Sequence, residues 1–118
     1  MTISWLPAQL EAVSEVLDRY PAESNRCELA ARELLPIARQ LEVAARARKL
    51  FPVEGRFLVP KRGVRWWEHV AVHVQQHVVD ALTGAHGTPE QSYLDQHYLY
   101  PDRLAWREWD EKEVAVKQ

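Results

Sequence analysis

The sequence lacks several features that would classify it at once. It has a single cysteine, Cys27, which excludes an internal disulfide and a cysteine-rich zinc cluster. The one thiol that remains is either an inert core residue or a reactive group. Internal repeats and low-complexity segments are also missing, so the chain is neither a solenoid nor a flexible linker.

Long apolar runs and a strong charge of either sign are absent too. No apolar run is long enough to span a bilayer, and the N-terminus has no signal-peptide pattern. The formal net charge is −2, which argues against a nucleic-acid or membrane partner. We therefore expect a cytoplasmic location, with no targeting or membrane segment.

The length and composition are those of one ordinary globular domain. A chain of 118 residues buries about two-thirds of its unfolded surface, which is enough for one hydrophobic core. The apolar and charged segments predict an α+β fold with N-terminal helices, a small antiparallel sheet and a short C-terminal helix. We expect the helical part at about 1–50, the sheet part at about 55–83, and the C-terminal helix and tail at 88–118.

The first helix is predicted from apolar residues that recur at steps of four and three, as on one face of an amphipathic helix. Pro7 fits its first turn, and the Tyr20-Pro21 pair ends it. The apolar face consists of Leu6, Leu10, Val13, Leu17 and Tyr20.

The second helix is predicted to begin directly before the cysteine. Asn25 is a favourable N-cap, and Glu28 three residues later completes a capping box. Cys27 then lies in the first helical turn, where unpaired N–H groups and the helix dipole lower the pKa of a thiol. Pro36 is expected to kink or break this helix, which resumes over 37–50.

Later segments give weaker signals. Residues 56–59 are predicted to form a short strand, followed by a turn at 61–63. The Thr-Pro-Glu-Gln run at 88–91 predicts the start of a short helix, with Thr88 as N-cap and proline at the first helical position. Trp106 and Trp109 are expected to cover the core.

The stretch 66–83, with the sequence WWEHVAVHVQQHVVDALT, carries three of the five histidines. Its alternating valines favour a β-hairpin that turns at Gln75-Gln76, because β-branched side chains fit a pleated sheet better than a helix. In that register His69 and Asp80 are diagonal neighbours on one face, within side-chain reach. A buried carboxylate beside a histidine fixes the imidazole tautomer and stabilises its charged form.

The same stretch has an alternative interpretation as a helix. His69, His73 and His77 then follow one another at i+4 steps, with Asp80 three residues further on, which is a candidate site for a divalent metal. The valines argue against the helix, whereas Gln-Gln is a weak turn signal and argues for it. We expect the hairpin, and with it no cofactor or metal.

In the hairpin, three residues form a set suited to thiol chemistry. Such chemistry needs a base within hydrogen-bond reach of the sulfur and a third group that orients the base. Cys27 at a helix start, His69 at a strand start and Asp80 on the next strand meet this need. The N–H groups of the first helical turn could contribute to an oxyanion hole.

These residues resemble a known family. The chain resembles the papain-like fold domains of bacterial polymorphic toxins over roughly residues 20 to 100. The small papain-fold toxins and related glutamine deamidases are the most similar groups. The resemblance rests on the patterns Asn25-x-Cys27-x-x-Ala30, His69-Val-Ala-Val and Val78-Val-Asp80.

The resemblance implies a papain-like half-fold and a cysteine hydrolase of the peptidase or glutamine deamidase type. Cys27 would be the nucleophile, His69 the general base and then acid, and Asp80 the orienting carboxylate of a reaction through a thioester. It also implies a protein or peptide substrate, a cognate immunity protein as a further partner, and delivery into a target cell as an effector.

The chain departs from the family pattern before the cysteine. Papain-like enzymes often carry a glutamine there that helps to hold the oxyanion, but residues 20–22 read Tyr-Pro-Ala. Asn25 or a backbone N–H is therefore the candidate donor. Trp66 and Trp67 are candidates for a pocket wall, and at most one of them can take that role because neighbours on a strand face opposite ways.

Two other function classes stay open. One is the metal-binding protein described above. The other is a non-catalytic interaction module, in which Cys27 is buried and the three residues have no joint role. The chain begins with its own methionine and has no visible delivery module, so we expect either a free-standing relative of the toxins or a domain expressed alone.

Overall fold

The computed structural model describes residues 2–62 and 65–110, which form an α+β fold. Two helices, α1 (Pro7–Arg19) and α2 (Cys27–Leu41), precede the strands in the sequence. A third helix, α3 (Glu90–His97), lies between the last two strands. The strands are β1 (Arg46–Pro52), β2 (His69–Val74), β3 (His77–Val79), β4 (Thr88–Pro89) and β5 (Leu104–Glu108). The two 3-10 turns are η1 (Ala22–Ser24) and η2 (Pro101–Arg103).

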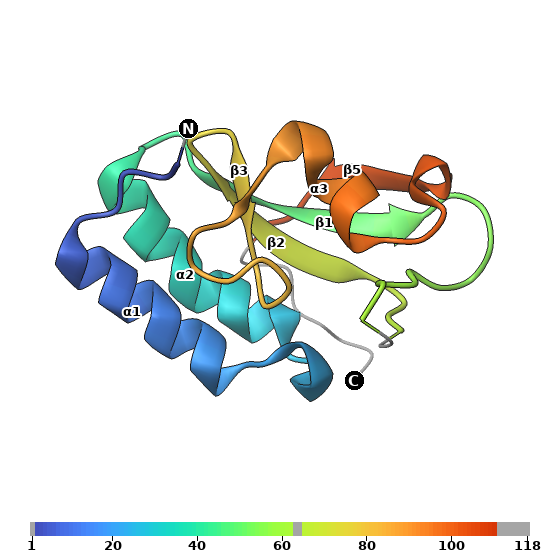
Figure 1. Ribbon diagram of the computed structural model, residues 1–118, viewed down its shortest axis with the longest axis horizontal. Helices are drawn as coiled ribbons and strands as arrows, with labels where there is room; N and C mark the ends of the chain where they lie inside the picture. The colour runs from blue at the N-terminus through green and yellow to red at the C-terminus, as the bar shows by residue number, and fades with distance from the viewer. Residues whose placement is uncertain (1, 63–64, 111–118) are drawn as a thin grey trace.

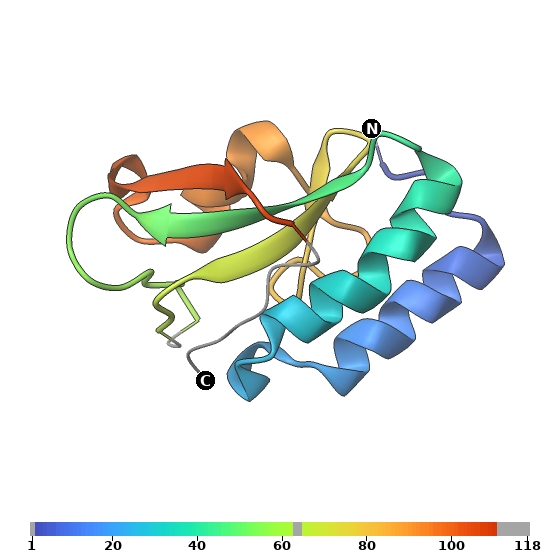
Figure 2. The same ribbon diagram turned by 180° about the vertical axis from the view of Figure 1, so that it is seen from behind.

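The strands form one sheet in the order β4-β3-β2-β1-β5, with every neighbouring pair antiparallel. Helices α1 and α2 cover one face of this sheet, and α3 lies against the other (Figures 1 and 2). Each face therefore has its own apolar core. The valines of β2 pack with α1 and α2 on one side, while Tyr93 of α3 packs with Leu50 and Ala71 on the other.

The predicted hairpin is confirmed. Strands β2 and β3 pair with Val74 opposite His77, so the turn consists of the two residues between them. Gln75 and Gln76 both have positive φ, 48° and 63°, as a two-residue turn between twisted strands requires. Neither is a residue that favours this conformation. The turn is held from outside, because the Gln75 N–H donates to Glu42 Oε1 at 2.7 Å.

The first helix agrees with its prediction, but the second is shorter than predicted. Helix α2 continues through Pro36 without a break and ends at Leu41. Residues 46–50, predicted as the end of this helix, belong instead to strand β1. This strand pairs with β2 on one side and β5 on the other, and these two ladders outweigh the helix propensity of its arginines, lysine and alanine.

The second half of the chain also differs from its prediction. The segment 56–59 is not a strand and makes only isolated bridges, Leu58 to Trp66 and, just beyond it, Pro60 to Tyr98. The sheet is larger than expected, since it extends through β5 near the end of the described chain.

The short C-terminal helix is confirmed, but Thr88 belongs to β4 and Pro89 is the N-cap of α3. Trp109 is buried and Trp106 partly buried, on opposite faces of the sheet. Gly63 of the predicted turn and the tail from 111 to 118 lie outside the described residues.

Candidate active site

Cys27 is the first residue of α2, as expected, and lies where this helix crosses the beginning of β2. Its Sγ accepts a hydrogen bond from the N–H of Val70 at 3.4 Å. The side chain is half-buried. The thiol is therefore held at the helix start by a strand that follows it in sequence by more than forty residues.

The predicted capping box at this helix start is wrong. The N-cap is Arg26, which makes no side-chain capping bond. Asn25 lies one residue earlier and adopts the left-handed conformation, with φ 61° and ψ 31°, which asparagine tolerates better than most residues. Its role is thus to turn the chain sharply into α2, and its side chain lines the space around Cys27.

His69 and Asp80 are almost fully enclosed, with 2% and 4% of their surfaces exposed. The Nε2 atom of His69 lies 2.8 Å from Asp80 Oδ2. The other carboxylate oxygen, Oδ1, accepts the backbone N–H groups of Leu82 at 2.9 Å and Thr83 at 3.0 Å. These bonds arise because the chain turns directly after β3, and they fix the carboxylate against the imidazole.

The second ring nitrogen of His69, Nδ1, is the one left for the thiol. It is buried and makes no hydrogen bond of standard geometry within the described part of the chain. Cys27 and this ring line the same cavity, and each group shifts the pKa of the other. The structure thus brings the three predicted residues together in the order thiol, imidazole, carboxylate.

The pKa values of the three groups favour an ion pair. Burial acts to raise the pKa of Cys27, but hydrogen bonding to His69 and the charge of that ring outweigh it and lower the pKa. Burial acts to lower the pKa of His69, yet Asp80 and Cys27 raise it to about 10. The pKa of Asp80 is lowered against its burial, chiefly by His69. All three directions thus favour the charged forms: thiolate, imidazolium and carboxylate.

Two tyrosines extend this set, and sequence reasoning missed them. Tyr93 on α3 donates its hydroxyl hydrogen bond to the same Asp80 oxygen that faces His69. The hydroxyl of Tyr98 lies 3.0 Å from that of Tyr93. Both tyrosines are buried. Their role depends on the docking of α3 onto the sheet, and the only signal in the sequence is two tyrosines five residues apart.

The two adjacent tryptophans lie just before β2, not in it, and differ in their surroundings. Trp66 is buried and stacks on His69, with ring centroids 4.3 Å apart and planes at 7°. A face-on aromatic ring favours the charged imidazolium. Trp67 is 67% exposed and contacts Phe57 edge-on at 5.2 Å. Each therefore lines a different space beside Cys27: Trp67 the open groove, and Trp66 a smaller cavity that His69 also lines.

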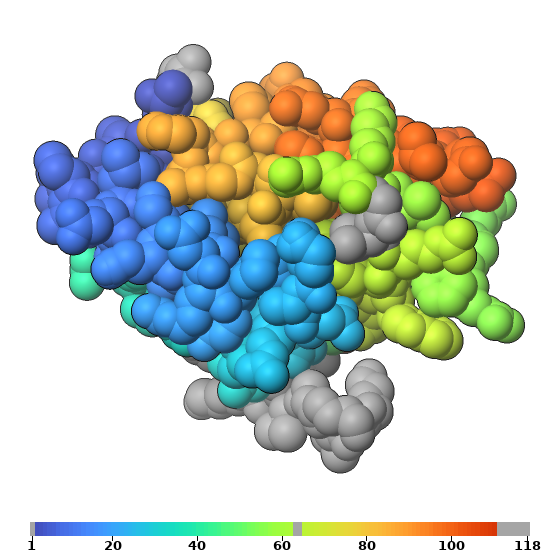
Figure 3. Space-filling model, turned by 60° about the horizontal axis from the view of Figure 1, so that its bottom comes forward, coloured from blue at the N-terminus to red at the C-terminus, as the bar shows by residue number. Residues whose placement is uncertain are grey.

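An open groove of about 600 Å³ reaches Cys27 from the surface. The start of α2 forms one wall, and the segment 67–70 forms the other. Figure 3 shows this face, where the blue residues before and at the start of α2 border the yellow-green segment that leads into β2. The volume is in the usual range for ligand sites.

A second, smaller cavity also lies beside Cys27. Its free volume of about 20 Å³ has room for about one water molecule. Cys27, His69, Tyr20 and Ala22 are among the residues that line it. Of these two spaces, His69 lines only the smaller cavity, whereas Cys27 lines both the cavity and the open groove.

The helix on which the metal alternative depended is not formed. His69, His73 and His77 lie instead on two strands, where His77 faces away from the other two. His73 pairs with Glu90 at 2.8 Å, and Asp80 is occupied by His69. Within residues 2–62 and 65–110, no group of three or more histidine, cysteine or carboxylate side chains could hold a metal ion.

In comparisons with known proteins, no family model, curated protein or solved structure matches this chain. The resemblance to papain-like toxin domains therefore stays a prediction. Within the described residues, no helix combines the length and the apolar character that a membrane crossing requires.

Proposed function

We propose that this protein is a cysteine-dependent amide hydrolase that uses Cys27 as nucleophile, His69 as proton carrier and Asp80 as the group that orients His69. The observation that supports this proposal best is that one ring nitrogen of His69 is hydrogen-bonded and the other, within the described residues, is not. Asp80 holds Nε2, which leaves Nδ1 for the thiol. A buried base that is oriented on one side and open to a nucleophile on the other is the arrangement that such catalysis needs.

The reaction would proceed by acyl transfer. The Cys27 thiolate attacks the amide carbonyl carbon, and its electron pair forms the C–S bond while the carbonyl oxygen takes the negative charge. His69 gives its Nδ1 proton to the departing nitrogen as the C–N bond breaks. A water molecule then attacks the thioester, His69 accepts its proton, and the acid and the free thiolate are released.

The negative oxygen requires hydrogen-bond donors beside the thiolate. The backbone N–H of Cys27 is available because the first N–H groups of a helix have no partner within the helix. The Asn25 side chain lines the same space and is the second donor in this proposal. The α2 dipole, positive at this end, stabilises both the thiolate and the oxyanion.

The two cavities favour a small leaving group. The acyl part of a substrate can reach Cys27 along the open groove, whereas the nitrogen that takes a proton from His69 leaves on the side of the smaller cavity. Ammonia fits a space of about 20 Å³, but a peptide chain does not. This favours the hydrolysis of a carboxamide, as in a glutamine side chain, over peptide cleavage.

The test is to incubate the protein with denatured casein and with short peptides that contain glutamine or asparagine. Released ammonia and new α-amines are both measured. We expect ammonia without new amines, and no activity in Cys27→Ser, which keeps the shape of the site. New amines without ammonia would reverse the choice of leaving group.

The interaction-module alternative, in which Cys27 has no chemical role, predicts a different result. The folded protein would then release neither product from any substrate, and its thiol would react only after unfolding. The papain-like toxin resemblance adds a proposed setting, a protein substrate in a target cell and a cognate immunity protein as partner. It rests on the sequence patterns alone.

A further inference from the structure

A buried lysine lies beside the candidate nucleophile. Lys49 on β1 is directly opposite Val70 on β2, the residue whose N–H contacts the Cys27 sulfur. Only 4% of the Lys49 surface is exposed, although its side chain lines the groove. Burying an ammonium group is unfavourable unless anions compensate it.

Two carboxylates from opposite walls of the groove provide this compensation. The Lys49 Nζ lies 3.3 Å from Glu68 Oε1 and 3.8 Å from Glu28 Oε2. Glu28 follows Cys27 in the first turn of α2. Glu68 directly precedes His69, the first residue of β2. The lysine thus connects the element that carries the thiol to the element that carries the imidazole.

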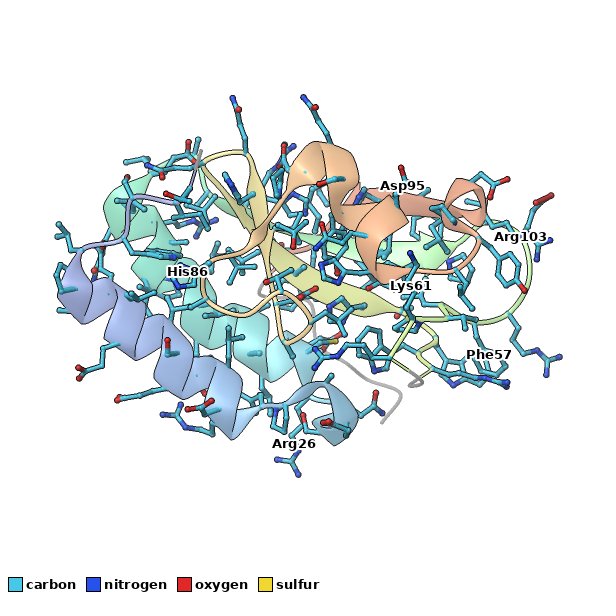
Figure 4. The ribbon with its side chains drawn as sticks, viewed as in Figure 1. Arg26, Phe57, Lys61, His86, Asp95 and Arg103 are labelled. Atoms are coloured by element: carbon cyan, nitrogen blue, oxygen red, sulfur yellow. The ribbon has the colours of Figure 1, made fainter. Side chains whose placement is uncertain are left out.

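The charge of Glu28, taken by itself, disfavours the thiolate form of Cys27. This negative charge acts to raise the pKa of Cys27, against the effect of His69. Of the other charged groups that line the groove, Arg26 points away from the body of the protein (Figure 4), and the guanidinium of Arg32 lies over the Trp109 ring at 5.8 Å. Lys49 lies within ion-pair distance of Glu28.

We propose that Lys49 is a positioning residue that neutralises Glu28 and ties the start of α2 to the start of β2, so that Cys27 stays ionised beside His69. This inference rests on the proposed function only in its use of the thiolate. It predicts opposite effects for two substitutions on one ion pair. Loss of Lys49 exposes the thiolate to an unpaired carboxylate, and loss of the Glu28 charge removes the opposing group.

The test is the rate of Cys27 alkylation by iodoacetamide against pH. In Lys49→Met the thiolate titrates at higher pH, and at pH 6 we expect alkylation to slow roughly three- to tenfold. In Glu28→Gln the thiolate titrates at lower pH, and alkylation at the same pH is faster. The alkylation rate of the double variant lies between those of the two single variants, and Lys49→Arg retains most of the wild-type rate.

Glu11→Gln on the exposed side of α1 is the matched control and leaves the profile unchanged. An unchanged profile in folded Lys49→Met, or a shift of the same sign in both single variants, would overturn the proposal. If Lys49→Met does not fold, the shift in Glu28→Gln decides. Because alkylation needs no substrate, this result stands apart from any failure to hydrolyse amides.

Discussion

The Asp80 carboxylate contacts the His69 imidazole on the side away from the thiol, with Oδ2 lying 2.8 Å from Nε2. Four donors surround this carboxylate: the imidazole, the Tyr93 hydroxyl and two backbone N–H groups. A carboxylate so fully hydrogen-bonded keeps its charge even when buried. The charge in turn keeps the imidazole protonated on Nε2 and directs Nδ1 toward Cys27.

Asp80→Asn is expected to preserve the shape of the site and to remove its charge. Its amide NH₂ group would meet two donors, His69 Nε2–H and the Tyr93 hydroxyl, so the imidazole loses its orientation. We expect kcat/KM for amide hydrolysis to fall roughly 10³- to 10⁴-fold. Breaking this buried pair should also lower the free energy of unfolding by about 3–5 kcal/mol. Steady-state kinetics and urea denaturation measure the two effects, and activity within a few-fold of wild type would contradict the role of Asp80.

The raised pKa of His69 and the lowered pKa of Cys27 predict how stability depends on pH. The contribution of His69 is complete below its ordinary pKa of 6.5 and is lost as the pH rises through about 10. The contribution of Cys27 acts in the opposite direction. It is complete above the ordinary thiol pKa of 9.0 and is lost as the pH falls through the lowered value.

Between pH 6.5 and pH 9 these two effects cancel wherever Cys27 of the folded protein is ionised, because the folded and unfolded pairs then hold the same number of protons. The unfolding free energy of the wild type should therefore be level in this window and fall above pH 9. Cys27→Ala removes the compensating group, so its stability should fall continuously from pH 6.5 upward, since Asp80 still raises the pKa of His69. Urea denaturation at pH 6.5, 8 and 9.5 distinguishes the two; parallel curves would contradict the ion pair.

Tyr93→Phe tests whether the tyrosine pair supports the carboxylate. The substitution keeps the aromatic ring in the core but removes the donor to Asp80, and it leaves the Tyr98 hydroxyl without that neighbour. We expect a loss of about 1–3 kcal/mol in unfolding free energy. Tyr98→Phe is the matched control: it removes only the outer bond and should cost less. Equal losses in the two variants, measured by urea denaturation, would show that Asp80 does not depend on Tyr93.

The residues of the candidate site were predictable from the sequence because their signals are local. The alternation of valines in β2 indicated the face on which His69 lies, and the polar loop before Cys27 indicated that a helix begins there, although Asn25 turns the chain and does not cap the helix. In both cases side-chain chemistry over a few neighbouring residues decides the backbone conformation.

The features that the sequence did not reveal depend on contacts between distant segments. Residues 46–50 are good helix formers that lie instead in an inner strand of the sheet, because β2 pairs with β1 on one side and β5 on the other. For the same reason Lys49 was not recognised, since only as a strand residue does it lie opposite Val70. The break predicted at Pro36 is absent for a similar reason. Pro36 lies on the exposed side of α2, and the packing of the opposite side on the sheet stabilises the helix.

The central claim is that His69 holds Cys27 as a thiolate, and the rate of Cys27 alkylation against pH tests it most directly, in wild type and in His69→Ala. The wild-type thiol should titrate below the ordinary value, and the variant thiol should titrate higher, because it loses both the hydrogen bond and the positive charge of the imidazole. Circular dichroism confirms that each protein is folded. A wild-type thiol that reacts only after unfolding, or profiles that coincide in the two proteins, would contradict the account.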